Sequence, residues 1–529
     1  MLISFSCKKA PIEIPFSKGT YDIELAQQKL IMVVEEEETD TISGFYIYNK
    51  ANAVEPKHPF KLSKNKSYLL FESDSINGKV KRKNPPKPMH ARFIVSGKNA
   101  SFFFWKNRRE MSYKKRQTYQ AEISSRYNKK QFSKLKTDYD LVYGNAKGYW
   151  TDTPYLDDPY IYILGRGVIN FWKGEKDLEL KLDLYRPEGD SLKLRPLVLL
   201  VHGGAFYIGN KQSETEIILA QRFAQLGYVA ASMNYRMGFR LKGYDVERTG
   251  YKSIQDVHAA LRYLAHNAEK YGIDPSHVYV AGTSAGAIAS LTIAYLDNNE
   301  RPESTFASRF LYDLGNIETS GNKYNEEFTI KAVGNMWGAV NDTAIINAGQ
   351  NVPVISFHGT NDDIVPIDHD FPFRFMMRFN RLVMNKMYGS RPVHEQLNRL
   401  KIDNELHVFE NEGHEPQLDN FKRVNDKLDF IAGKMESFFY KYTAPQIKTF
   451  KSNITVNKLS PIEAIYYEVN NGEVSLIEVS GGIPASNNKT ENRIIWFSDT
   501  EKGKFTIHTK NRFGATTQKA IVVTIEQID

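Results

Sequence analysis

Hydrophobic and polar residues follow three different patterns along this chain of 529 residues. Up to about residue 120, short apolar runs are separated by turn-forming pairs such as Gly-Lys and Asn-Gly, which predicts short antiparallel strands. The expected strands are Leu30–Glu35, Gly44–Tyr48, Tyr68–Glu72, Ala91–Val95 and Ser101–Trp105. We therefore expect an N-terminal tail (1–17), a small antiparallel β-barrel or sandwich (18–125) and a basic, polar linker (126–150).

From about Leu178, strand-length apolar runs alternate with helix-length amphipathic segments. This alternation predicts an α/β domain with a doubly wound, mostly parallel sheet, which we place at residues 151–443. The expected strands are Leu178–Leu184, Leu197–His202, Tyr228–Met233, Val278–Ala281, Ala332–Trp337, Val354–His358 and Glu405–Phe409. The expected helices are Glu214–Leu226, Ser253–Lys270, Ala285–Tyr295, Phe371–Met387, Val393–Leu400 and Phe421–Tyr442.

After Pro445 the helical pattern ends, and further strands are expected at the spacing of a β-sandwich. These strands are Ile454–Val456, Ile465–Val469, Ser475–Val479, Ile494–Phe497, Lys504–Lys510 and Ala520–Ile525. With its Trp496 and its Asn511-Arg-Phe-Gly514 turn, the C-terminal part (444–529) resembles a PKD or Ig-like module. We expect it to be an Ig-like β-sandwich.

Charge changes this picture only locally. The formal net charge is +8, but 18 of the 70 Lys and Arg residues and only two of the 62 acidic residues lie between Lys79 and Lys136. The rest of the chain is mildly acidic and no nucleic-acid recognition motif accompanies the basic segment, so we expect no nucleic-acid partner. A solvated surface explains the segment without a partner. Its interleaved aromatic residues leave an anionic polysaccharide or lipid headgroups as the alternative.

The single cysteine, Cys7, excludes a disulfide framework, a Cys-rich zinc module and an iron–sulfur cluster within the chain. It follows small and apolar residues and precedes Lys8 and Lys9, as at the end of a bacterial lipoprotein signal. On that interpretation Cys7 carries a lipid that anchors the protein to a membrane, and we expect an extracytoplasmic location, periplasmic or at the cell surface. The alternatives are an ordinary cysteine in the tail and a cytoplasmic protein.

The sequence Gly282-Thr-Ser284-Ala-Gly286 follows an apolar strand and precedes a helix of small residues. A nucleophile elbow requires this strand–turn–helix context, because glycines on both sides of the serine leave room for neighbouring backbone. The N-terminus of the following helix also faces developing negative charge. A glycine-rich turn is the alternative interpretation of the pentapeptide alone. In this context we expect Ser284 to be a nucleophile.

A second glycine-rich loop, His202-Gly203-Gly204-Ala205, follows another apolar strand. Glycine lets such a loop turn its backbone N–H groups toward one oxygen without a Cβ clash. Together with the N–H group of Ala285, the amides of Gly203, Gly204 and Ala205 are expected to form an oxyanion hole. We expect His202 to hold the loop rather than to take part in the reaction.

With these motifs, residues from about Tyr155 to Tyr442 resemble an α/β-hydrolase of the carboxylesterase and hormone-sensitive-lipase type, similar to bacterial feruloyl-esterase-like enzymes. The motifs occur in the order of that family over more than half of the chain. They are Leu182–Pro187, the loop at His202–Gly204, Ser232–Arg236, Asp256–Leu264, Asp274–Pro275 and Gly282–Gly286. Ala205 stands where many members have a third glycine; its N–H group is still available, while its methyl group can narrow the acyl pocket.

The resemblance also implies an acid and a histidine, which follow the nucleophile in this order along the chain. Asp362 falls on the family's acid position, in a turn after an apolar strand, and Asp363 is the neighbouring alternative. His414 lies on a loop after a later strand and is the expected general base. His358 and His369 are expected to be structural.

The expected function is hydrolysis of carboxylic esters through an acyl-enzyme on Ser284, without a metal or an organic cofactor. The expected substrate is a small-molecule ester or an ester linked to a polysaccharide. Two further segments each admit two interpretations. Asn298–Phe328 is either part of the substrate pocket or a plain loop. Phe371–Gly389 is either part of the substrate pocket or a core helix.

Two other functions are weighed against ester hydrolysis. A peptidase of the prolyl-oligopeptidase type shares the catalytic order, but it usually carries a β-propeller, for which the N-terminal β-region is too short. A binding protein on an inactive hydrolase scaffold is disfavoured, because Ser284, Asp362 and His414 are all present.

Overall fold

The protein is described by a computed structural model, which divides the chain into two compact units. Unit 1 contains Met1–Ile123, Pro445–Asn511 and Thr516–Asp529, and unit 2 contains Ser124–Ala444 and Arg512–Ala515. Cys7 lies outside the described residues. In the part of the chain that is described, no helix is both long and apolar enough to cross a membrane. The described residues are 16–25, 28–48, 57–63, 69–71, 89–96, 99–104, 107–116, 121, 123–153, 174–240, 243–309, 311–347, 349–376, 380–419, 422–457, 465–487, 491–497 and 500–526.

In unit 1, antiparallel strands close into a barrel, because β1 (Gly19–Leu25) pairs both with β2 and with the last strand, β8. The other strands are β2 (Gln28–Glu37), β3 (Thr41–Tyr48), β4 (His58–Ser63), β5 (Leu69–Phe71), β6 (Met89–Ser96), β7 (Asn99–Phe104) and β8 (Asn107–Lys115). β1, β4 and β8 are missing from the strands expected above. The alternation of β1, with Tyr21 and Ile23 buried, is a signal that could have been used. The dense basic residues of β8 hide its alternation.

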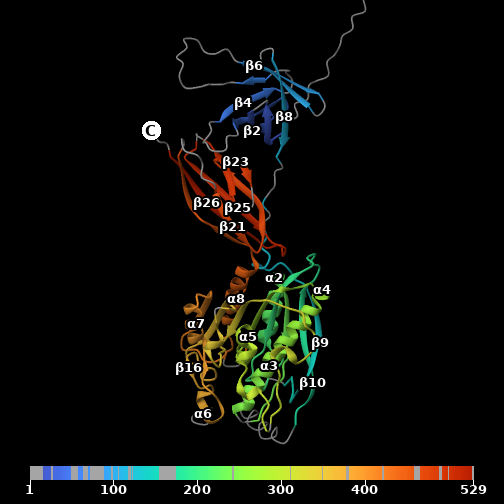
Figure 1. Ribbon diagram of the computed structural model, residues 1–529, viewed down its shortest axis with the longest axis vertical. Helices are drawn as coiled ribbons and strands as arrows, with labels where there is room; N and C mark the ends of the chain where they lie inside the picture. Colours follow the sequence, from blue (N-terminus) through green and yellow to red (C-terminus); the bar gives the residue numbers. More distant parts are fainter. Residues whose placement is uncertain are drawn as a thin grey trace, which may run out of the picture. The chain divides into compact units, whose positions relative to one another are not determined.

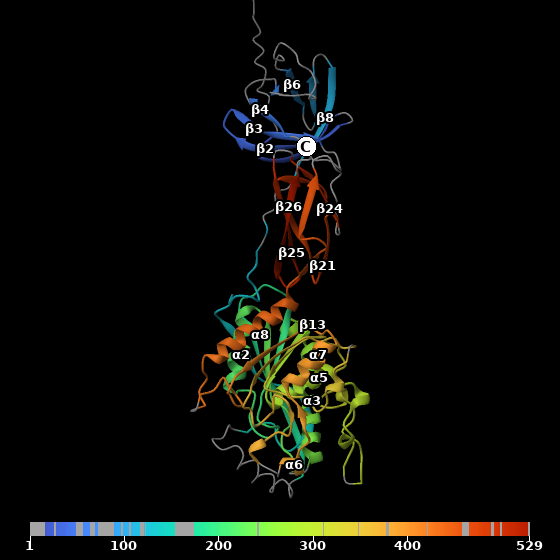
Figure 2. The same cartoon turned by 90° about the vertical axis from the view of Figure 1, so that its left-hand side faces the viewer.

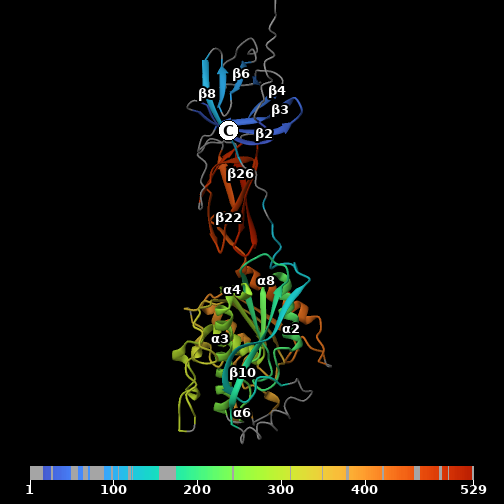
Figure 3. The same cartoon turned by 90° about the vertical axis from the view of Figure 1, so that its right-hand side faces the viewer.

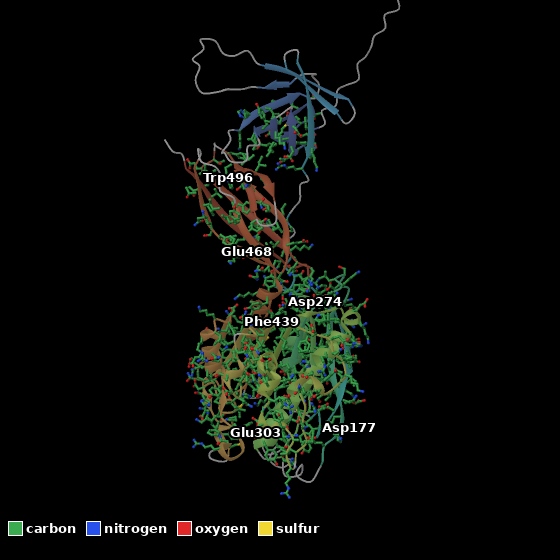
Figure 4. The ribbon with its side chains drawn as sticks, viewed as in Figure 1. Asp177, Asp274, Glu303, Phe439, Glu468 and Trp496 are labelled. Carbon is green, nitrogen blue, oxygen red and sulfur yellow. The ribbon has the colours of Figure 1, made fainter. Side chains whose placement is uncertain are left out.

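Two four-stranded sheets make up the C-terminal part of unit 1, in the orders β19-β21-β24-β23 and β20-β26-β25-β22. Side chains from both sheets, among them Tyr467, Trp496 (Figure 4) and Phe505, form one buried apolar cluster. The strands are β19 (Gln446–Thr449), β20 (Asn453–Asn457), β21 (Ile465–Asn470), β22 (Glu473–Ser480), β23 (Gly482–Asn487), β24 (Glu491–Trp496), β25 (Lys502–Lys510) and β26 (Thr516–Glu526). β19 and β23 are not among the strands expected from the sequence.

The regions 18–125 and 444–529, expected to be separate domains, belong to one compact unit. A buried apolar cluster joins Ile31 and Ile47 of the barrel to Ile483 and Ile495 of the C-terminal sheets. Most side chains of the basic segment Lys79–Lys136 lie outside the described part of the chain, so its expected partners stay predictions.

Unit 2 is built on an eight-stranded sheet with the order β18-β15-β14-β13-β11-β12-β10-β9. β10 runs antiparallel to its neighbours β9 and β12, and all other neighbours are parallel. This doubly wound, mostly parallel sheet fits an α/β-hydrolase, as expected. Its strands are β9 (Leu135–Gly148), β10 (Lys176–Pro187), β11 (Arg195–Val201), β12 (Val229–Met233), β13 (Ile273–Thr283), β14 (Ile330–Met336), β15 (Val354–Gly359) and β18 (Asn404–Phe409).

Helices cover both faces of this sheet, so that central strands such as β11 are buried along their whole length. Helices α2 and α8 pack together on one face and α3 and α5 on the other (Figure 2); Figures 1 and 3 show unit 2 from two other sides. The α-helices are α2 (Glu214–Leu226), α3 (Gly243–His266), α4 (Ala268–Tyr271), α5 (Ala285–Tyr295), α6 (Asn380–Val383), α7 (Ser390–Arg399) and α8 (Lys427–Thr443). Short elements are η1 (Asn298–Glu300), η2 (Glu303–Thr305), η3 (Ile317–Thr319), η4 (Thr343–Ile345), η5 (Arg374–Met376), β16 (His369–Asp370) and β17 (Met387–Tyr388).

The segment 126–150 is not the linker that its composition suggested. Tyr127 is fully buried in the core of unit 2, and β9 forms the edge of the sheet along β10. Many side chains of β9 stay exposed at this edge of the sheet, so its polar composition resembles that of a linker. Unit 2 therefore begins near Ser124, and not at residue 151, where the α/β domain was predicted to begin.

The helix expected over Phe371–Met387 is also wrong. The described residues there form η5, the four-residue α6 and the start of β17, which pairs with β16 immediately before this segment. Phe373 has a φ of 56°, outside the helical region, and Pro372 precedes it. These features stop a continuous helix despite the run of good helix formers.

Residues Arg512–Ala515 were expected in the C-terminal module but pack in unit 2. Phe513 is fully buried in the same apolar cluster as Tyr279 and Phe439. Arg512 forms an ion pair with Asp274, with an N···O distance of 2.6 Å. The core of unit 2 is therefore completed by a segment distant in sequence.

The packing of α8 gives a test of this core. Phe439 (Figure 4) is fully buried and stacks on Tyr279, with ring centroids 4.6 Å apart. We expect Phe439→Ala to lower the free energy of unfolding by ~3–5 kcal/mol, because it leaves a cavity. Phe430→Ala, at a position of the same helix that is 43% exposed, should cost about 1 kcal/mol or less. Urea unfolding followed by circular dichroism measures both; equal losses would contradict the packing.

Candidate active site

Ser284 lies in the turn between β13 and α5 with φ 50° and ψ −117°. A non-glycine residue held in such a conformation stores roughly 1–3 kcal/mol of strain. Neighbouring backbone imposes it: a Cβ on Gly286 would lie 2.0 Å from the Val201 carbonyl oxygen, and one on Gly282 2.4 Å from the Gly286 carbonyl carbon. Only glycine allows β11, β13 and α5 to approach so closely. The turn thus holds the Ser284 side chain at the N-terminus of α5.

Two side chains from distant loops meet Ser284. The Ser284 hydroxyl lies 2.9 Å from Nε2 of His414, and Nδ1 of His414 lies 2.7 Å from Oδ2 of Asp362. Asp362 follows β15 and His414 follows β18, and the carboxyl ends of parallel strands meet at one edge of the sheet. A Cβ on Gly359 would lie 2.3 Å from the carbonyl oxygen of Glu412, so glycine is needed where the two loops touch.

The structure brings Asp362, and not the alternative Asp363, to His414. Asp362 is fully buried, and its Oδ1 accepts hydrogen bonds from the backbone N–H groups of Ile364 and Val365, both at 2.9 Å. Asp363 is exposed. The turn therefore directs only one of the two neighbouring carboxylates inward.

Electrostatics fix the protonation of this pair. Burial by itself raises the pKa of Asp362, but the charge of His414 and hydrogen bonds from His358 and His414 lower it below its ordinary range. Burial by itself lowers the pKa of His414, and the Asp362 charge and hydrogen bond more than reverse this, so the pKa is raised. Asp362 is consequently an anion that accepts the Nδ1–H of His414, which leaves the Nε2 lone pair toward Ser284.

The loop predicted to supply an oxyanion hole lies beside the elbow. A Cβ on Gly203 would lie 3.2 Å from the Cβ of Ser284, and Gly204 has a φ of 105°. Ala205 and Ala285 line the same cavity as Ser284. Within the described residues, the backbone N–H groups of Ala205 and Ala285 donate to no protein acceptor. Gly203 and Gly204 shape the loop, while Ala205 and Ala285 offer N–H groups at the cavity.

His202 stabilises this loop through contacts with its backbone. Its Nδ1–H donates to the carbonyl oxygen of Gly203 at 2.7 Å, and burial lowers its pKa to about 4, so the ring is neutral. The ring stacks on Tyr235, whose hydroxyl donates to the carbonyl oxygen of His202 at 2.9 Å. No role is expected for Tyr235 from the sequence, although this residue lies in the family motif Ser232–Arg236.

Glu216 of α2 is a buried carboxyl group beside the elbow that the sequence analysis also missed. It accepts hydrogen bonds from the hydroxyl of Thr283, at 2.7 Å, and from that of Ser213. Burial raises the pKa of Glu216 to about 7. A glutamate in the first turn of a helix is common on surfaces, so the sequence carries no signal of its burial. In the described residues no group of three or more His, Cys, Asp or Glu side chains could hold a metal ion.

A cavity of about 300 Å³ opens beside Ser284. The two segments that admitted two interpretations both line it: Asn298–Phe328 contributes Glu300 and Pro302, and Phe371–Gly389 contributes Phe373 and Met387. The second segment is thus part of the pocket wall rather than a core helix.

Comparisons with known proteins point to one enzyme class. Residues 182–351 match the family described as BD-FAE. A probable carboxylic ester hydrolase, LipM, from Mycobacterium tuberculosis is 25% identical over 213 residues, which cover 37% of this chain and 48% of LipM. The para-nitrobenzyl esterase of Bacillus subtilis is 31% identical over 114 residues, which cover 21% of this chain and 23% of that enzyme. The matches thus span about half or less of these relatives' own lengths.

Among solved structures, a truncated carbohydrate esterase from gut microbiota superposes with a TM-score of 0.36 and 17% identity. The superposition covers 58% of this chain and 96% of that one.

Adding one methyl group should have opposite effects on stability at Gly286, in the crowded turn after Ser284, and at Gly433, in α8. Gly286→Ala places a Cβ 2.0 Å from the Val201 carbonyl oxygen and should destabilise unit 2 by about 3 kcal/mol or more. Gly433→Ala, in the middle of α8 with nothing within 4 Å of the added Cβ, should stabilise it by ~0.5–1 kcal/mol. Melting temperatures of the two variants provide the measurement, and a Gly286→Ala variant as stable as the wild type would contradict the crowding.

Proposed function

We propose that unit 2 hydrolyses carboxylic esters through an acyl-enzyme on Ser284, with His414 as general base and acid and Asp362 as the orienting acid. The observation that supports this most is the pair of hydrogen bonds that links Ser284 through both ring nitrogens of His414 to Asp362. The similarity to named ester hydrolases supports the same reaction class.

In the proposed reaction, Nε2 of His414 takes the hydroxyl proton of Ser284 while Oγ attacks the ester carbonyl carbon. The carbonyl oxygen becomes an oxyanion that accepts hydrogen bonds from the loop Gly203–Ala205 and from Ala285. One such donor is worth roughly 2.7–4 kcal/mol in the transition state. His414 then protonates the leaving alcohol. A water molecule, deprotonated by His414, hydrolyses the acyl-enzyme by the same steps in reverse.

The proposed substrates are short-acyl esters of small molecules or esters linked to a polysaccharide. The cavity beside Ser284 supports a compact acyl group, because its wall near the nucleophile is apolar and includes Ile288 and Val365. The lipid on Cys7 and the extracytoplasmic location remain predictions from the sequence. Turnover of p-nitrophenyl acetate and of acetylated xylan, compared with a peptide p-nitroanilide, separates this proposal from the peptidase alternative.

Three substitutions test the assigned roles. Ser284→Ala should abolish ester turnover and labelling by a fluorophosphonate without unfolding the protein, because it removes only the nucleophile. Asp362→Asn should lower kcat by roughly 10²–10⁴, because an amide cannot hold the required histidine tautomer. Asp363→Asn is the matched control, since that carboxylate is exposed, and should leave kcat unchanged. Unchanged hydrolysis by Ser284→Ala would dispose of the proposal.

The raised pKa of His414 predicts the pH dependence. A general base must be unprotonated, so kcat/KM should fall as pH decreases through the pKa of His414. Because Asp362 raises that pKa, the acid limb should lie above the ordinary histidine value of 6.5. Asp362→Asn removes the charge, and its residual activity should have an acid limb at lower pH. If the acid limb of the pH profile does not move in Asp362→Asn, Asp362 does not raise the pKa of His414 and the prediction is wrong.

A further inference from the structure

A second imidazole borders the Asp362 carboxylate and has no part in the steps above. Nε2 of His358 lies 3.2 Å from Oδ2 of Asp362 and 3.0 Å from the carbonyl oxygen of Val365. His358 and Asp362 are both fully buried. Oδ2 is also the oxygen that receives Nδ1–H of His414. The two imidazoles therefore share one carboxylate oxygen.

The proton positions on His358 follow from Asn335 of β14. Its Oδ1 accepts the N–H of Gly338 at 2.9 Å, so its Nδ2 faces the hydroxyls of Ser356 and Ser390 and donates to both, at 2.8 and 3.1 Å. Ser390 accepts from Asn335 and donates its own proton to Nδ1 of His358, 2.7 Å away. Because Nδ1 is the acceptor, the ring carries a proton on Nε2, which faces both the Val365 carbonyl oxygen and Asp362.

The hydrogen bonds of Asn335 form a network with two branches, one through Ser390 to His358 and one through Ser356 to His394. The second branch does not reach the active site. Nδ1–H of His394 donates to Oδ1 of Asn404 at 2.7 Å, because the Asn404 amide nitrogen is already used as a donor. Nε2 of His394 therefore accepts from the hydroxyl of Ser356, also at 2.7 Å. Burial lowers the pKa of His394 to about 4, so this ring is neutral. The two branches match in chemistry and burial, and only one ends on Asp362.

We propose that His358 is a positioning residue for the reaction: its Nε2–H, oriented by Ser390 and Asn335, donates to the Val365 carbonyl oxygen and also contacts Oδ2 of Asp362, and this contact holds the carboxylate in the orientation that His414 requires. This inference rests on the proposed function. His358 does not line the cavity beside Ser284, so it acts through Asp362.

The physical effect is twofold. Oδ1 of Asp362 receives two backbone N–H groups, and Oδ2 receives Nδ1–H of His414 and lies 3.2 Å from Nε2 of His358, so the carboxylate cannot rotate without losing these interactions. The N–H of His358 also stabilises the negative charge on Oδ2 of Asp362. The carboxylate therefore attracts the proton of His414 less strongly. In keeping with this, the hydrogen bond from His358 helps to reverse the effect of burial and to keep the pKa of Asp362 low.

Other charged groups face this pair and are the same in every variant below. Arg374 donates to the backbone carbonyl oxygen of Asp362 at 2.6 Å. Near His414, Glu415 raises the pKa of the ring and Lys422 lowers it. Differences between the variants therefore report on the His358 branch.

Ser390→Ala and Ser356→Ala form a matched pair, because both hydroxyls are fully buried and accept from Asn335, but only Ser390 donates to His358. We expect Ser390→Ala to lower kcat/KM for p-nitrophenyl acetate roughly 10-fold, as for the loss of one hydrogen bond. Its acid limb should move upward by about 0.5 pH unit, because Asp362 then holds the His414 proton more tightly. Ser390→Thr keeps the hydroxyl and should restore both values. Ser356→Ala should leave both at the wild-type level.

Identical pH profiles for Ser390→Ala and Ser356→Ala, at comparable melting temperatures, would overturn the proposal. If Ser390→Ala does not fold, Ser390→Cys fills the same space with a weak donor and gives the same comparison. If the wild type hydrolyses no ester, the proposed function fails, and proton NMR still tests the contact. The low-field Nδ1–H resonance of His414 should then titrate at higher pH in Ser390→Ala than in Ser356→Ala, and equal titration would refute the role of His358.

Discussion

The contact of three backbone segments at Ser284 is the constraint on which the active centre of unit 2 depends. The carbonyl oxygen of Val201 at the end of β11 comes so close to Gly286 at the start of α5 that no Cβ fits between them. This contact sets the twisted backbone of Ser284 and places the loop after β11 beside the start of α5. Ala205 and Ala285, which are some eighty residues apart in the chain, then line the same cavity and carry the N–H groups proposed to bind the oxyanion. A wider separation would leave Ser284 without these donors, even with His414 in place.

The sequence predicts those parts of the site whose requirements are local. Glycines around Ser284 and in the loop at His202 are needed by the backbone itself, so they can be identified without knowing the fold. The choice between Asp362 and Asp363 is different, because two neighbouring carboxylates differ only in the direction that the turn gives them. The backbone N–H groups of Ile364 and Val365 decide it, and that turn geometry is visible only in the structure. Glu216 and the contact of His358 with Asp362 escape the sequence for the same reason.

In the fold, the errors fall where tertiary contacts override local pattern. The alternating α/β segment was predicted well, because strands buried on both faces are continuous apolar runs. β9 was missed because many side chains of this edge strand stay exposed and polar, which hides its strand pattern. The apolar run after Phe371 was expected to be a helix. Its described residues form short separate elements instead, and several of its side chains line the cavity. The spacing of apolar residues along the sequence does not by itself distinguish a segment that lines a pocket from a helix packed in the core.

The place of β9 and of Arg512–Ala515 in unit 2 governs how the polypeptide can be shortened and in what order it can mature. A fragment limited to 151–443 would leave the outer edge of β10 with unpaired N–H and C=O groups, a template for strand addition between molecules. It would also lack the ring of Phe513 in the apolar cluster that contains Tyr279 and Phe439. During synthesis from the N-terminus, the apolar core of unit 2 is not complete until the hairpin at residues 512–515 has left the ribosome, long after α8 itself. Until then the nascent chain exposes an unfilled apolar site, which makes this stage the one most exposed to aggregation.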